Sequence, residues 1–120
     1  MNARTHSGLR IHVVDAERGS IAEGLQVEVF RLGQGAEKRF SGRLDGNGPL
    51  VDPALRAPGL EPGEYEVVFH LGDYYRGHAR AGSQPPFLES VTLQLGIADP
   101  EASYELPLRI HPLGICMPGV

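Results

Sequence analysis

The chain has 120 residues, a formal net charge of −4 and a single lysine, Lys38. A domain of this length buries a sizeable core, and without a basic cluster nucleic acid is an unsuitable partner. No apolar run approaches the roughly 18 residues of a membrane span. The first eight residues lack the apolar core of a signal peptide, and Cys116 is the only cysteine. These features favour a cytoplasmic protein.

Apolar and polar residues alternate in a series of short segments, which is the pattern of β-strands with one buried face. We predict strands at residues 9–15, 25–32, 38–44, 64–71, 87–95, 103–112 and 113–117, with one more short strand allowed in the proline-rich loop 49–63. Residues 45–48 read Asp-Gly-Asn-Gly, a tight-turn sequence. With 16 Gly and 10 Pro, this spacing predicts an all-β sandwich of seven or eight strands.

One helix is expected, at residues 73–80, with Asp73 as its N-cap. Residues 1–8 are polar, so we expect a flexible N-terminus. No linker, repeat or low-complexity tract divides the remainder. We therefore predict a single domain over residues 9–120.

The strand predicted at 103–112 has an unusual second face. Its two faces carry Tyr104, Leu106, Leu108 and Ile110 on one side and Glu105, Pro107, Arg109 and His111 on the other. Pro107 has no N–H for the ladder, which indicates a gap or an edge at this point. A solvated face of an edge strand explains this stretch taken alone. In the strand 9–15, Arg10 and His12 similarly share the face opposite Ile11.

Three stretches carry a family resemblance. Residues 11–15 read Ile-His-Val-Val-Asp, residues 69–75 read Phe-His-Leu-Gly-Asp-Tyr-Tyr, and Gly-Ile-Ala-Asp-Pro-Glu-Ala at 96–102 precedes Tyr104, Pro107, Leu108, Pro112 and Gly114. In this order and spacing they resemble the transthyretin and 5-hydroxyisourate hydrolase family. The resemblance implies an eight-stranded transthyretin-like sandwich with one short helix. It also implies a homotetramer, a dimer of dimers, with sites in an inter-subunit channel.

The resemblance implies hydrolysis of a cyclic amide in purine catabolism, by two histidines, one arginine and a C-terminal Tyr-Arg-Gly-Ser. Only the first histidine has a counterpart, His12. Asn47 stands where the family has the arginine, Glu105 stands where it has the second histidine, and the tetrapeptide is missing. Activity therefore does not transfer with the fold.

His12 is the candidate base that activates water, because imidazole titrates near neutral pH. Glu105 has two interpretations. If the first and penultimate strands pair, its carboxylate could accept a hydrogen bond from His12 and orient the ring. Otherwise it is a surface carboxylate on an interface that has lost its chemistry.

The candidate substrate-binding residues are Arg10, Asn47, Arg109 and Cys116. Arg10, Arg43 or Arg109 could replace the missing guanidinium, or be a rim charge. Cys116 is either a nucleophile or a small apolar filler. The histidines show no spacing typical of a metal site, so we predict neither metal nor cofactor.

Three functions remain open on the sequence. The leading one is a hydrolase that opens the ring of 5-hydroxyisourate, or of a substituted, for example N-methylated, or related purine-derived ureide. The alternatives are a non-catalytic transthyretin-like tetramer that binds a small molecule, and a purely structural tetramer. The cluster of titratable residues on the predicted channel face favours the hydrolase, since apolar ligands prefer apolar pockets.

Overall fold

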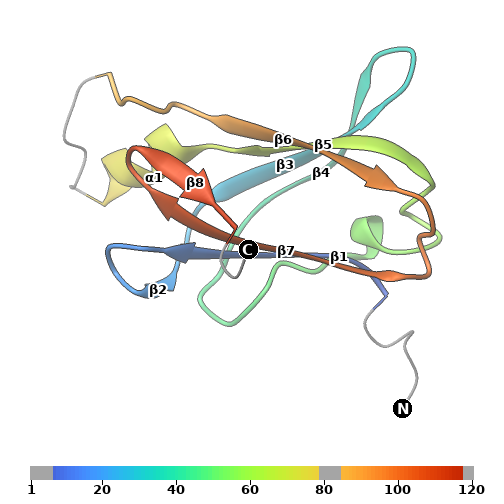
Figure 1. The fold of residues 1–120 in the computed structure, drawn as a ribbon, viewed down its shortest axis with the longest axis horizontal. Helices are drawn as coiled ribbons and strands as arrows, with labels where there is room; N and C mark the ends of the chain where they lie inside the picture. Colours follow the sequence, from blue (N-terminus) through green and yellow to red (C-terminus); the bar gives the residue numbers. More distant parts are fainter. Residues whose placement is uncertain (1–6, 79–84, 118–120) are drawn as a thin grey trace.

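The computed structural model describes residues 7–78 and 85–117. Two four-stranded sheets lie face to face, and a single α-helix follows the fifth strand (Figure 1). The elements are β1 Gly8–Asp15, β2 Ser20–Ile21, β3 Gln26–Leu32, β4 Ala36–Arg43, β5 Gly63–Phe69, α1 Leu71–Gly77, β6 Val91–Ile97, β7 Ser103–His111 and β8 Gly114–Cys116, with a 3-10 helix at Pro53–Leu55. The predicted eight-stranded all-β sandwich with one short helix is confirmed.

Each sheet combines strands that are distant in the sequence. The first sheet has the order β2-β1-β7-β8, and the second has the order β4-β3-β5-β6. β1 and β7 run parallel, with Ile11 opposite Leu106 and Val13 opposite Leu108. The other neighbouring strands are antiparallel. The first and penultimate strands are therefore neighbours, as the Glu105 hypothesis requires.

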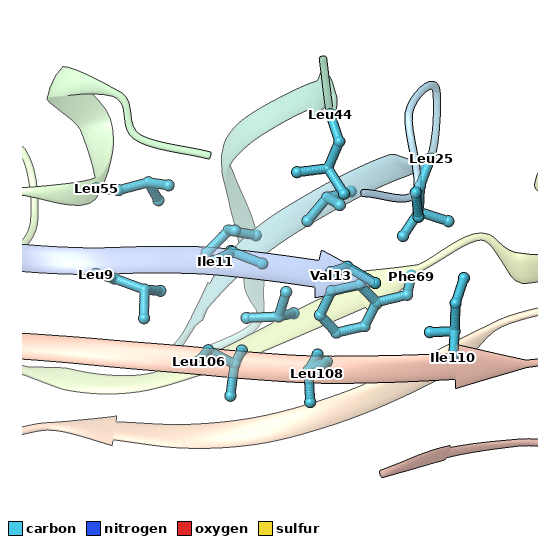
Figure 2. Close-up of a cluster of buried hydrophobic side chains, with 14 of the residues drawn as sticks. Leu9, Ile11, Val13, Leu25, Leu44, Leu55, Phe69, Leu106, Leu108 and Ile110 are labelled. Atoms are coloured by element: carbon cyan, nitrogen blue, oxygen red, sulfur yellow. The ribbon is translucent and has the colours of Figure 1, made fainter. Parts of the chain in front are cut away.

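The core lies between the two sheets and is filled by every second residue of their central strands. Figure 2 shows Ile11, Val13, Leu106 and Leu108 of the first sheet in one cluster with Phe69 of the second. All five are buried, and a fully buried side chain of this size contributes about 1.5–3 kcal/mol. Because side chains alternate across a strand, this burial forces the intervening polar residues of β1 and β7 onto the outer face.

Several boundaries differ from the sequence prediction. β4 begins two residues early, at Ala36, and β6 covers Val91–Ile97 rather than 87–95. β2 lies where only a turn was expected, and pairs with the end of β1. The edge expected at Pro107 is confirmed: in the described structure β8 pairs with β7 only along Arg109–His111.

The helix begins earlier than predicted, at Leu71, and its N-cap is His70, so the assignment of Asp73 as N-cap is wrong. Asp73 lies within the first turn, where a carboxylate still interacts favourably with the helix dipole, and its side chain pairs with Arg76 one turn later. The helix ends at Gly77; the last residues of the predicted helix, and residues 1–6 of the predicted flexible N-terminus, lie outside the described residues.

Candidate active site

The outer face of the first sheet brings together five of the six candidate residues. The strand register arranges this face in three rows. The rows are Arg10–Glu105, His12–Pro107 and Val14–Arg109–Cys116, and we call this surface the outer face of the first sheet. It combines a carboxylate, an imidazole, two guanidiniums and a thiol.

Arg10 and Glu105 form an ion pair across the β1–β7 boundary, with 3.3 Å between Nη1 of Arg10 and Oε2 of Glu105. Glu105 is 58% exposed, whereas Arg10 is 29% exposed. The hydrogen bond anticipated from His12 to Glu105 is not among the contacts of the described residues. The reason is the register, which sets Glu105 opposite Arg10 and sets Pro107 opposite His12.

His12 is half-buried in the middle row. Within residues 7–78 and 85–117, no hydrogen bond or ion pair engages its ring. Arg10 lies two residues before it on β1, about 7 Å along the strand, and Arg109 lies in the row on the opposite side. The imidazole thus lies in the row between those of Arg10 and Arg109, on the outer face of the first sheet.

Two hollows adjoin this face. One of about 350 Å³ is lined by Arg109, His111, Leu113 and Cys116, among others, at the β7–β8 hairpin. The other, of about 220 Å³, includes Arg10 and lies where β1 begins. Cys116 is exposed and lies opposite Arg109, one row away from His12.

Asn47 lies apart from these rows, in the turn that follows β4. Its side chain is exposed, and its backbone N–H donates to Oδ1 of Asp45 at 2.9 Å. The nearby Leu50 exchanges two backbone hydrogen bonds with Ile11, at 2.7 and 3.2 Å, so this turn segment borders β1. Arg43 belongs to the second sheet and donates to the Gly24 carbonyl at 3.1 Å. Of the three arginines considered, only Arg10 and Arg109 lie on the outer face of the first sheet.

Arg56 is a residue that the sequence did not suggest. It lines the hollow beside Arg10 because Gly8, with φ of +91°, packs closely against it. A Cβ at Gly8 would lie 2.5 Å from the Cβ of Arg56. A glycine directly before a predicted strand is the only sequence signal for such a close approach.

The described residues contain no group of three or more His, Cys, Asp or Glu side chains that could hold a metal ion. Two imidazole–carboxylate pairs occur among the described residues, His70–Glu28 at 2.8 Å and His111–Glu17 at 3.5 Å. Within the same part of the chain, no helix has the length and apolar character needed to cross a membrane.

Known proteins resemble this chain in sequence and in fold. A sequence profile of the HIUase/Transthyretin family matches residues 9–117. A 5-hydroxyisourate hydrolase 2 from Rhizobium meliloti (strain 1021) is 37% identical over 107 residues, which cover 88% of this chain and 89% of the relative.

Two solved structures extend the likeness to the fold. A crystal structure of (S)-allantoin synthase superposes with a TM-score of 0.81 at 29% identity, and covers 91% of this chain but 42% of the other. Transthyretin from Sparus aurata superposes with a TM-score of 0.76 at 22% identity, and covers 92% of this chain and 93% of the other. This chain belongs to the HIUase/Transthyretin family.

Proposed function

We propose that this protein is a hydrolase that opens the ring of 5-hydroxyisourate, or of a substituted or related purine-derived cyclic ureide. The observation that carries the proposal is the position of His12, unengaged by the described residues and set in the row between those of Arg10 and Arg109 on the outer face of the first sheet. The 5-hydroxyisourate hydrolase from Rhizobium meliloti that is 37% identical supports the same reaction class.

In the proposed reaction, His12 takes a proton from a water molecule as the water oxygen adds to the carbonyl carbon of the ring amide. A guanidinium, from Arg10 or Arg109, stabilises the negative charge that develops on the carbonyl oxygen. The C–N bond then breaks, and His12 returns the proton to the leaving nitrogen. The ring opens to a carboxylic acid without any metal or cofactor.

The proposal places the site in a channel between subunits of a homotetramer. Support comes from apolar side chains near β8: Leu113 is 66% exposed and Met117 is 46% exposed. Apolar residues at a short edge strand favour association with another chain. Sedimentation at micromolar protein should therefore give a tetramer, and a uniform monomer would contradict the shared channel.

The activity is tested by following the decay of the substrate itself. 5-Hydroxyisourate and its N-methylated analogues are generated in situ from the corresponding urates, and their absorbance decay is compared with and without protein. Because these compounds decay spontaneously, the measured quantity is the acceleration. We expect the protein to accelerate at least one decay; binding without acceleration of any of them would instead support the small-molecule binder.

A further inference from the structure

The ion pair at one end of the outer face of the first sheet has a composition suited to recognition. A carboxylate only accepts hydrogen bonds, and a guanidinium only donates them. Arg10 and Glu105 stand directly opposite each other on neighbouring strands, with their charged groups 3.3 Å apart. An acceptor and a donor are therefore held side by side, facing the same way out of the sheet.

The ion pair leaves the carboxylate of Glu105 able to accept more hydrogen bonds. The pair involves one oxygen of the carboxylate. A carboxylate offers about four acceptor positions. With Glu105 58% exposed, its carboxylate is accessible to a bound molecule.

We propose that Arg10 and Glu105 together recognise one edge of the substrate ring, where an unsubstituted N–H lies next to a carbonyl. Glu105 accepts the hydrogen bond from the ring N–H, and Arg10 donates to the neighbouring carbonyl oxygen. This inference rests on the proposed function, since it takes a cyclic ureide as the ligand. It narrows that ligand to rings whose nitrogen at this edge carries no alkyl group.

The position of the pair relative to His12 fits this assignment. The two rows are about 7 Å apart along the strand, a span that a heterocycle lying flat on the sheet can cover. Pro107, which lies opposite His12, presents an apolar ring between the polar groups. One edge of the substrate would then rest on Arg10 and Glu105 while the other end reaches His12. Arg109, on the far side of His12, is left as the guanidinium for the developing oxyanion.

An alkyl group on the recognised nitrogen should weaken binding strongly. It removes the donor and places a methyl against a carboxylate, which then loses a partner while remaining covered by the ligand. Hydrogen bonds to charged groups contribute about 1.5–3 kcal/mol, which corresponds to a loss of roughly 10- to 100-fold in affinity. Methyl groups on other ring nitrogens should have much smaller effects.

The test measures binding of urate and of its four mono-N-methyl isomers by calorimetry, because these ligands present such edges and need not be turned over. We expect one isomer to bind roughly 10- to 100-fold more weakly than urate to the parent protein. In Glu105→Met this discrimination should fall close to onefold, because the acceptor is gone. Glu66→Met, the same change on the outer face of the second sheet, should retain the full discrimination.

Arg10→Lys provides a second variant that keeps the charge but loses the planar guanidinium. It should lower the affinity for urate and leave the loss of affinity caused by the methyl group unchanged. The inference is overturned if all methyl isomers bind like urate, if discrimination survives in Glu105→Met, or if urate does not bind at millimolar concentration. Discrimination that depends on Glu105 in a protein without hydrolytic activity would retain the recognition pair and reject the hydrolase. Hydrolysis without such discrimination would retain the hydrolase and reject the recognition pair.

Discussion

The outer faces of the two sheets carry similar kinds of residues and use them differently. On the second sheet, Glu28 is held between two bases, with Lys38 Nζ at 2.9 Å and His70 Nε2 at 2.8 Å. On the first sheet, Arg10 pairs with Glu105, whereas the ring of His12 engages no described residue. A histidine thus completes a hydrogen-bonded cluster on one face and engages no described residue on the other.

The difference separates a structural role from a chemical one. The hydrogen bond from Lys38, followed by the one from His70, lowers the pKa of Glu28 below its usual range, so these groups stabilise one another in the folded chain. A group that is already paired in this way is less able to exchange protons with a ligand. The contrast predicts that changes on the first face affect activity, whereas changes on the second affect stability.

The largest expected effect comes from replacing the two histidines in turn. His12→Gln should reduce the acceleration of 5-hydroxyisourate decay by about 10²- to 10⁴-fold, because general-base catalysis typically contributes that much. It should barely change the free energy of unfolding. His70→Gln, the matched change on the second sheet, should keep the activity. Decay kinetics and urea unfolding of both variants measure this separation.

Two results would break the comparison. If His70→Gln slowed the reaction as much as His12→Gln, the second face would be part of the site. If His12→Gln were nearly silent while Cys116→Ser abolished activity, the thiol of Cys116 would be the nucleophile. The rows of the sheet favour neither of these results, since Cys116 lies one row away from His12.

The first sheet also contains a group that is fixed by hydrogen bonds, the buried carboxylate at the end of β1. Asp15 accepts hydrogen bonds from the Tyr74 hydroxyl at 2.7 Å and from two backbone N–H groups, those of Glu17 and Arg18. Burial, followed by the hydrogen bond to Asp15, raises the pKa of Tyr74. Tyr74→Phe should therefore cost about 1.5–3 kcal/mol of unfolding free energy, measured by urea denaturation.

The neighbouring Tyr75 provides the control for this change. Its hydroxyl is buried and has no hydrogen-bond partner among the described residues. Tyr75→Phe removes an unsatisfied polar atom, so it should be neutral or slightly stabilising. Equal destabilisation by the two substitutions would mean that loss of packing, rather than loss of the hydrogen bond to Asp15, explains the cost.

Much of the fold could be predicted because it follows from alternation within single strands. The pattern at 103–112 placed Leu106, Leu108 and Ile110 in the core and Glu105 and Arg109 outside, as the structure has them. Alternation also assigned His12 to the outer side of β1. Strand β2 was missed because a two-residue strand is too short to show a period.

Contacts between strands could not be predicted in the same way. The sequence left open whether Glu105 orients His12 or is a surface carboxylate, and the register pairs Glu105 with Arg10. A shift of the strand register by two residues keeps every side chain on its face. Alternation therefore cannot distinguish Glu105 opposite His12 from Glu105 opposite Arg10. The approach of Arg56 to β1 likewise depends on the path of a loop rather than on any pattern. The chemical roles of His12, Glu105, Arg10, Arg109, Asn47 and Cys116 stay predictions.

The smallest expected effect tests the paired side of the comparison through pH. The pKa of Glu28 is lowered in the folded chain. The ionised side chain therefore contributes its full stabilisation above the pKa that Glu28 has in the unfolded chain, ordinarily 4.5. The contribution is lost as the pH falls below that value and through the folded-state pKa. Glu28→Gln should thus cost about 0.5–1 kcal/mol of unfolding free energy near pH 7, and the difference from the parent should shrink toward pH 3.

Urea unfolding across this pH range measures the difference in unfolding free energy, with Glu66→Gln on the neighbouring strand as the control. Since no ion pair to Glu66 is found within the described residues, that variant should show little dependence on pH relative to the parent. A Glu28→Gln difference that stayed constant down to pH 3 would show that the cluster stabilises the fold by shape and packing rather than by charge.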